Sequence, residues 1–435
     1  MTQAAGAGAG TGKSAGLGRR VSSNFVWSLM SVAVGKGAFV FANIYLARSL
    51  GVSGFGMFML AQTVALYFWL AVDLGTNMYG IREIAKNKDD AEGLINTLMG
   101  LRITAGVLMF ALYSLGLVIL GYPHDQTLAF AGCGLYLITY SLYSDWVFKG
   151  LERFKFIAYG SLVSSVVFLA GVLAVVKSGE DVALAAFLWS GSFFLASVSL
   201  LRVLTRRLGI RFRPAFNPGQ WLPHLKESIY FTVSGGLMTV YNYLPLFLLK
   251  YYYTDFEVGL FSAPFRVVLA VGGAGFLIPS SFYPVLAELY HRDIAAFRKM
   301  RQKLQLIMLA LGAPVAVVAF VFAEEGVRLI WGPEYMGSVP VVRVTCWLVP
   351  LYFIRYSYGS VLFATGFQKW QNLGGLAGAA GILVSSFILV PVTGVLGASD
   401  SLVFSEALIV LTMMAVSNRV LGEKRLMEKA AGGAA

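Results

Sequence analysis

Five basic residues stand inside long apolar stretches of the sequence, where a charged side chain is energetically costly. They are Lys36, Arg102, Arg266, Arg343 and Arg355. An ionised side chain near a bilayer centre costs roughly 2.5–3.5 kcal/mol, so it normally faces protein or water. Lys36, Arg266 and Arg355 are the deepest, whereas Arg102 and Arg343 lie near a predicted span end, where snorkelling is an equally good interpretation. Because Arg and Lys bind phosphate well, we predict a cationic cavity for an anionic, phosphate-bearing substrate.

Polar side chains accompany these cations. Tyr352 and Tyr356 share a predicted helix with Arg355, and Asn242 interrupts another apolar stretch. Aromatic rings with hydroxyl groups suit the faces of sugars. The alternative is that these side chains simply pack in the protein core. We therefore keep these three residues as candidate substrate contacts in the cavity.

Acidic residues inside the apolar stretches are fewer and more peripheral. Asp73 and Glu406 are the candidates for coupling transport to an ion, and each lies within a few residues of a predicted span end. A pathway for cations or cationic drugs would call for central carboxylates, so a drug/cation antiporter is kept as the alternative. The histidines are only three and far apart in the sequence, which predicts no metal or cofactor site.

The composition defines the elements that must position these residues. Hydrophobic residues make up 57% of the 435 and charged residues 13%, against about 25% charged in soluble domains. A spanning helix needs about 20 apolar residues, and each stretch here is too long for a barrel strand. The sequence therefore predicts an all-α integral membrane protein with twelve transmembrane helices. The predicted spans are 24–46, 54–75, 97–120, 126–148, 155–177, 182–202, 227–249, 257–282, 304–323, 339–363, 370–391 and 402–420.

The loop charges orient these spans. Twelve spans place both termini on one side, and most of the 34 lysines and arginines fall there. The loops of the other side hold only Arg48, Lys177, Lys250 and Arg328. The positive-inside rule then predicts that both termini are cytoplasmic. The same bias accounts for the net charge of +12 without nucleic-acid binding, and the short outer loops argue against an enzyme such as a glycan polymerase or ligase.

The sequence pattern also indicates two similar halves. The longest inner loop, 203–226, contains three prolines and lies at the middle of the chain. Gly56-Met57-Phe58 follows the first span and Gly259-Leu260-Phe261 follows the seventh, a separation of 203 residues. We predict six-helix lobes at 21–202 and 227–421 around a central cavity, joined by a cytoplasmic linker at 203–226, with cytoplasmic tails at 1–20 and 422–435.

Several short sequence motifs resemble those of one protein family. Ala47-Arg48-Ser49-Leu50-Gly51, Asp73-Leu74-Gly75, Arg82-Glu83-Ile84-Ala85 and the stretch 148–154 are similar to the first half of Wzx-type polysaccharide flippases. Val258-Gly259-Leu260-Phe261 resembles the matching second-half piece. This family belongs to a superfamily that includes the MATE exporters and the lipid II flippases.

The resemblance implies a MATE-like fold and a transport function. The expected activity is movement of an undecaprenyl-pyrophosphate-linked oligosaccharide from the inner to the outer leaflet of a bacterial inner membrane, by alternating access. Membrane lipids are implied as partners, as are H⁺ or Na⁺ as a coupling ion and the machinery that polymerises the glycan.

Overall fold

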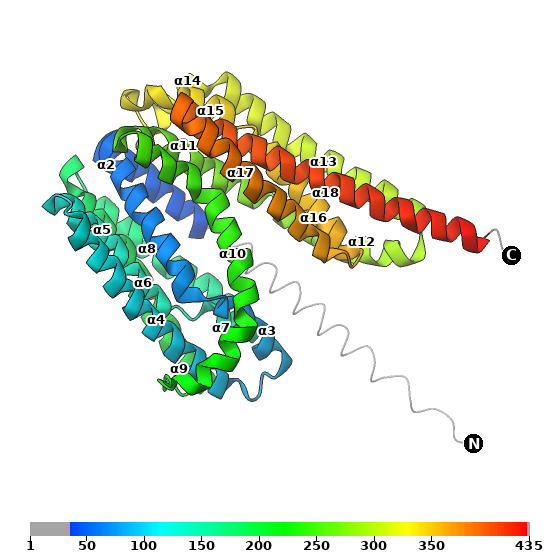
Figure 1. Cartoon of the computed structure of the whole chain (residues 1–435), viewed down its shortest axis with the longest axis horizontal. Helices are drawn as coiled ribbons and strands as arrows, with labels where there is room; N and C mark the ends of the chain where they lie inside the picture. Colours follow the sequence, from blue (N-terminus) through cyan, green and yellow to red (C-terminus); the bar gives the residue numbers. More distant parts are fainter. Residues whose placement is uncertain (1–34, 433–435) are drawn as a thin grey trace, which may run out of the picture.

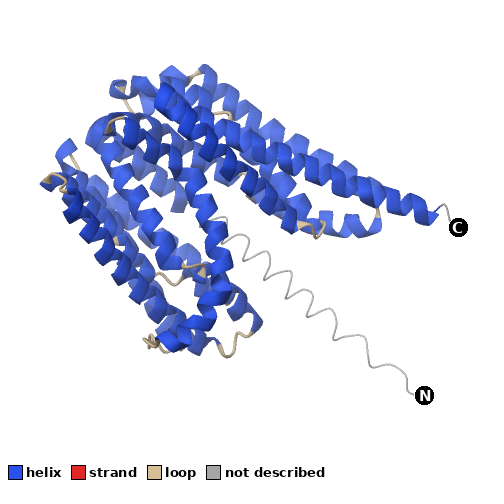
Figure 2. Ribbon diagram, viewed as in Figure 1, coloured by secondary structure: helices blue, strands red, loops and turns tan. Residues whose placement is uncertain are grey.

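The computed structural model describes residues 35–432, and within that range the chain folds into helices without a strand (Figure 2). The first helices are α2 (Lys36–Asp73), α3 (Thr76–Lys86), α4 (Ala91–Leu120), α5 (His124–Gly134), α6 (Tyr136–Ser141), α7 (Asp145–Gly150), α8 (Phe154–Val175) and α9 (Val182–Leu208). The later helices are α10 (Pro218–Tyr252), α11 (Asp255–Ala274), α12 (Leu277–Arg292), α13 (Ile294–Val321), α14 (Ala323–Ile330), α15 (Val339–Thr345), α16 (Leu348–Ala364), α17 (Gln371–Thr393) and α18 (Val395–Gly432). Short 3₁₀ turns lie at Gly179–Asp181 (η2), Pro333–Ser338 (η3) and Gln368–Trp370 (η4).

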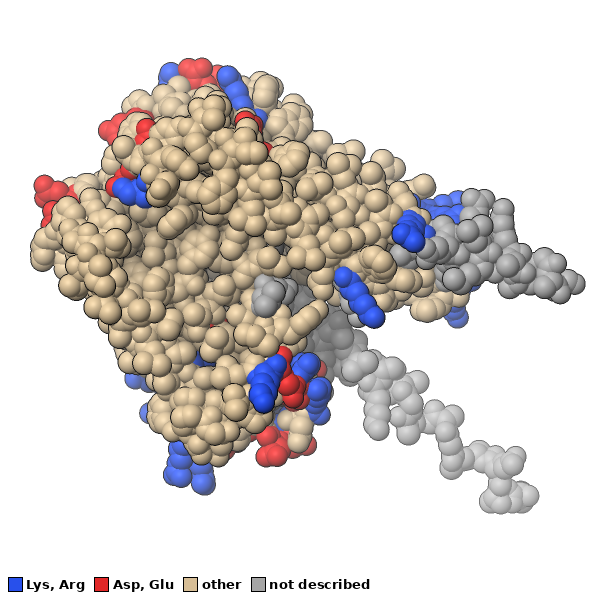
Figure 3. Space-filling model, viewed as in Figure 1, with Lys and Arg blue, Asp and Glu red and all other residues tan. Residues whose placement is uncertain are grey.

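The structure confirms the all-α membrane class. Nine helices of the described range are long and apolar enough to cross a membrane. On the face shown in Figure 3, a broad uncharged band separates two ends that carry the charged side chains. Large apolar side chains such as Val118, Leu329 and Val392 are exposed, as expected of a surface that meets lipid. The chain is a multi-pass membrane protein.

Three of the twelve predicted spans have no separate counterpart among the nine helices. The first two predicted spans run together in α2, which contains one non-helical residue, Gly51, at φ 67° and ψ 177°. Only glycine adopts that backbone conformation readily, so the chain turns there without a separate loop. The predicted span 126–148 is divided among α5, α6 and α7, each too short to qualify. The predicted span 227–249 lies in α10, which is not among the nine. Twelve spans and cytoplasmic termini therefore stay predictions.

Gly51→Ala is expected to lower the free energy of unfolding by about 1–3 kcal/mol, because alanine is strained at a positive φ with an extended ψ. Thermal unfolding of the purified protein in detergent measures this change. Gly116→Ala is the matched control, since a Cβ there meets no atom within 4 Å. Equal stability of the two variants would contradict the strained turn.

The helices form two groups. In Figure 1, α2 to α9 make one group and α11 to α18 the other, with α10 passing between them. The groups lie close together where α14 is found and diverge toward α3 and α12. We call these regions the α14 end and the α3 end.

A spacing of 203 residues recurs between the groups. Helix α4 begins at Ala91 and α13 at Ile294, the same separation as between Gly56 and Gly259. Helices α2 and α11, which carry these glycines, pack along each other. The arrangement agrees with two parallel repeats, and the lobe boundaries stay predictions.

Candidate functional site

A cavity of about 390 Å³ lies between α2, α10 and α11. Its polar lining residues are Asn43 from α2, Tyr243 from α10 and Arg266 from α11. Apolar residues, among them Phe39 and Trp331, complete the wall. Because α2 belongs to the first group and α11 to the second, the cavity lies where relative motion of the groups would reshape it.

Arg266 brings an uncompensated positive charge to this cavity. Its Nη2 donates a hydrogen bond to Oε1 of Gln62 at 3.0 Å, and its Nε lies 3.3 Å from Sδ of Met59. Among the described side chains, no carboxylate forms an ion pair with Arg266. A half-buried guanidinium held only by an amide and a thioether keeps most of its affinity for an anion.

Arg355 is placed differently. Its Nε lies 3.0 Å from Oε1 of Glu406; the Glu406 side chain is fully buried, and that of Arg355 is 13% exposed. The hydroxyl of Tyr241 donates to Oε2 of Glu406 at 2.5 Å. The guanidinium lies 5.0 Å from the ring centre of Tyr352 and 5.2 Å from that of Tyr356. The predicted tyrosine cluster therefore surrounds an arginine that a carboxylate neutralises.

The first group contains a second buried pair. Nη1 of Arg102 lies 3.2 Å from Oδ1 of Asp73, and the Arg102 side chain is fully buried. Its guanidinium lies over the rings of Trp69 and Trp146, at 5.1 and 5.9 Å from their centres. Full burial excludes the snorkelling interpretation for Arg102, because the charge does not reach the surface.

The predicted site residues thus separate into different places. Arg266 lines the cavity, and Asn242 is half-buried on α10 beside the cavity residue Tyr243. The side chain of Lys36 lies outside the described residues. Arg102 with Asp73 and Arg355 with Glu406 form two separate ion pairs.

Two polar residues near the cavity escaped the sequence reasoning. Asn43 and Gln62 are buried, at 8% and 3% exposure, and Asn43 lines the cavity. Both stand in stretches that read as membrane spans, and a buried amide there calls for a polar partner. The cost of burial was applied only to the charged residues of the sequence. Applied to amides as well, it would have identified both Asn43 and Gln62.

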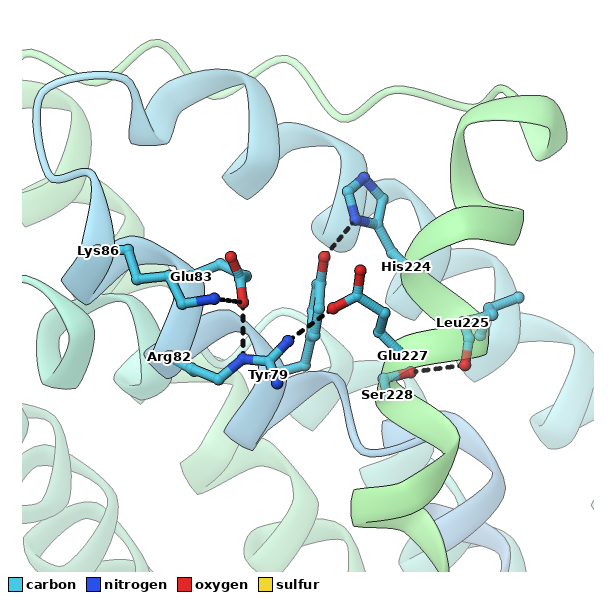
Figure 4. Close-up of polar contacts among 8 residues, drawn as sticks. All are labelled: Tyr79, Arg82, Glu83, Lys86, His224, Leu225, Glu227 and Ser228. Atoms are coloured by element: carbon cyan, nitrogen blue, oxygen red, sulfur yellow. Dashed lines mark hydrogen bonds and ion pairs between the residues drawn. The ribbon is translucent and has the colours of Figure 1, made fainter.

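At the α3 end, a polar cluster joins α3 to α10 (Figure 4). Arg82 lies 2.6 Å from Glu83 and 2.7 Å from Glu227, and Lys86 lies 2.8 Å from Glu83. The hydroxyl of Tyr79 lies 2.8 Å from Nδ1 of His224. The start of α10 is therefore fixed to the first group.

The predicted linker 203–226 is also bound to the first group. The backbone N–H of Ala215 donates to the carbonyl of Asn96 at 2.9 Å, and that of Arg213 donates to Oδ1 of Asn96 at 2.7 Å. The backbone N–H of Arg211 donates to Glu92 at 3.1 Å. Rocking of one group against the other therefore requires bending beyond these contacts, along α10.

Hydrogen bonds from Lys86 and Arg82 lower the pKa of the Glu83 carboxyl. The contact stabilises the fold above the unfolded pKa of about 4.3, and the stabilisation is lost as pH falls through the lowered folded value. Glu83→Gln should therefore cost less than about 1 kcal/mol of unfolding free energy at neutral pH, as for other solvent-exposed ion pairs. Unfolding titrations at pH 7 and in acid test this, with the exposed Glu325→Gln as control. A cost that grows in acid would contradict the assignment.

Two groups of membrane-type helices with a cavity between them, lined in part by polar residues, form an architecture that is typical of transporters. The family described as polysaccharide biosynthesis protein matches residues 21–290. The chain belongs to that family, which confirms the resemblance seen in the motifs.

Curated relatives match over most of their length. A protein described as an O-antigen transporter of Shigella dysenteriae is 26% identical over 85% of this chain and 93% of its own. One from Escherichia coli (strain K12) with the same description is 23% identical over 87% and 92%.

Solved structures share the fold. The lipid II flippase MurJ in an inward closed conformation gives a TM-score of 0.67 at 14% identity, covering 90% of this chain and 87% of that one. An inward-facing multidrug resistance MATE family transporter of the MOP superfamily also gives 0.67 at 12% identity, covering 91% and 98%. The predicted MATE-like architecture is confirmed at the level of the fold.

Proposed function

We propose that this protein is a flippase that moves an undecaprenyl-pyrophosphate-linked oligosaccharide from the inner to the outer leaflet of a bacterial inner membrane. The observation that carries the proposal is Arg266, a cation without a carboxylate partner among the described side chains, in the wall of a cavity between two groups of helices. The family and the relatives described as O-antigen transporters support a polysaccharide cargo. In this proposal both termini are cytoplasmic, and the two groups are six-helix lobes.

The cavity would replace the solvation of the charged head group. A bare pyrophosphate in hydrocarbon is prohibitively costly, since one unpaired ion costs tens of kcal/mol in the Born limit. Arg266, with Lys36 from the start of α2, would pair with the phosphates while the polyprenyl tail stays in the bilayer. Asn43, Asn242 and Tyr243 would contact the sugars through hydroxyl and amide groups.

The two buried ion pairs suggest how an ion could be coupled to transport. Glu406 neutralises Arg355, and Asp73 neutralises Arg102. Protonation of either carboxylate would release its arginine to bind the anionic cargo. In this proposal Asp73 and Glu406 take up the coupling H⁺, and the arginines with Tyr352 and Tyr356 form secondary contacts for the head group.

The test uses a strain whose surface polysaccharide depends on this protein. Lys36, Arg266 and Arg355 are replaced singly by alanine, and surface glycan and inner-leaflet lipid-linked glycan are quantified at equal protein levels. The proposal expects reduced export and accumulated precursor. Normal export by all three variants would refute it. Resistance to cationic drugs that depends on the chain would instead favour the MATE-like antiporter.

A further inference from the structure

We propose that the crossing of α2 and α11 at the α14 end is the outer gate of the cavity, and that Arg48 and Tyr335 hold this gate closed. The inference rests on the alternating access of the proposed function. Its test needs no substrate, so the gate and the cargo are tested separately.

The crossing is a close contact between two glycines and two backbone segments. A Cβ built on Gly56 would lie 1.8 Å from the carbonyl oxygen of Asp255, and one built on Gly259 would lie 2.0 Å from that of Val52. Val52 and Asp255 are also 203 residues apart, so the two contacts are copies of each other. Because this contact joins the two groups, rocking that separates them at this end would have to open it.

Two hydrogen-bonding side chains flank the crossing, and we call them the latch. Nε of Arg48 donates to the carbonyl of Ile330 at 2.7 Å, and its Nη2 donates to that of Leu329. These are the last carbonyls of α14, which lack partners within the helix and attract a positive charge. The hydroxyl of Tyr335, itself 1% exposed, donates to the carbonyl of Ala47 at 3.0 Å.

Both latch contacts join the first group to the second. Arg48 and Ala47 belong to α2, whereas α14 and Tyr335 belong to the second group. At the α3 end, by contrast, α12 packs on α13 and α16 within its own group. Separation of the groups at the α14 end must therefore break the latch and part the two glycines.

The gate is also coupled to the cavity, because the same two helices form both. Arg266 follows Gly259 by seven residues on α11, about 10 Å along the axis. Gln62, which holds the Arg266 guanidinium, follows Gly56 by six residues on α2. Opening of the crossing would separate Arg266 from Gln62, so the gate position changes the surroundings of the cavity charge.

Accessibility of a cavity cysteine tests the gate. The buried Cys133 and Cys346 are replaced by alanine, and the cavity residue Ala270 is replaced by cysteine. A membrane-impermeant maleimide is then added to the outside of intact spheroplasts. Tyr335→Phe should raise the labelling rate about fivefold, the shift expected when one stabilising hydrogen bond is lost from a two-state equilibrium. Arg48→Gln, which removes the guanidinium that donates to both Ile330 and Leu329, should raise it at least as much.

The chain offers matched controls. Tyr253 also donates to a backbone carbonyl, that of Pro391 at 3.0 Å, but within the second group. Arg328 pairs with Glu324 inside α14. Tyr253→Phe and Arg328→Gln should leave the labelling rate unchanged. Latch variants that label from outside no faster than these controls would overturn the gate.

A larger side chain at the crossing gives an independent test of the gate. Gly56→Ala should raise outside labelling more than the latch variants do, because its Cβ collides with a backbone carbonyl. Gly116→Ala is the control in open space. If Gly56→Ala does not fold, Tyr335→Phe decides the question, since it removes a single hydroxyl. If the latch variants label as expected but the protein exports no glycan, the gate is supported and the proposed cargo is refuted.

Discussion

Arg266→Ala is expected to reduce glycan export at least roughly 30-fold, the loss typical of removing a charged hydrogen-bonding partner from a buried anion site. Arg266 is the described cavity cation that no described carboxylate neutralises, so no neighbour replaces it. Surface polysaccharide per cell, normalised to the amount of membrane-inserted protein, measures the effect. Arg266→Lys should retain part of the activity, because it keeps the charge and loses the fork of donors.

Arg343→Ala is the matched control for this prediction. Arg343 also lies in a predicted span, but its side chain is exposed and does not line the cavity. Its replacement should leave export near the level of the unchanged protein. Equal losses in the two variants would show that Arg266 acts on folding or insertion and not on the cargo.

Breaking the buried Arg355–Glu406 pair is expected to destabilise the fold by about 3–5 kcal/mol, because the remaining charge is left buried without its counterion. Arg355→Ala and Glu406→Ala should each show this loss in denaturant titrations of the purified protein in detergent. Glu406→Ala also removes the acceptor of the Tyr241 hydroxyl.

The Arg355→Ala/Glu406→Ala double variant distinguishes the contribution of the ion pair from that of side-chain packing. Removing both partners should recover part of the loss, so the two single effects should not add. The exposed Arg328–Glu324 pair on α14 is the control, and its single variants should cost less than about 1 kcal/mol. Additive effects of Arg355→Ala and Glu406→Ala would contradict the pair as a coupled unit.

The sequence predicted what depends on local composition. Apolar length gave the helical membrane class, and the cost of buried charge selected Arg266 and Arg355 before the structure placed them. The sequence also showed that Gly56 and Gly259 head similar segments, because the motifs repeat.

The sequence did not reveal which residues meet across the fold. Glu406 follows Arg355 by 51 residues and Arg102 follows Asp73 by 29, and no periodicity relates partners on different helices. The contact between Gly56 and Gly259 likewise depends on how the two groups pack. The merging of two predicted spans in α2 depends on one backbone conformation, at Gly51, which a hydropathy window does not register.

Translocation in proteoliposomes tests the central claim most directly. The purified protein is reconstituted with an undecaprenyl-pyrophosphate-linked oligosaccharide, and the arrival of glycan at the opposite leaflet is followed with an impermeant lectin. A cationic central cavity predicts flipping by the unchanged protein and by Arg343→Ala, and almost none by Arg266→Ala. Equal flipping by all three, or uptake of a cationic dye with no flipping at all, would contradict it.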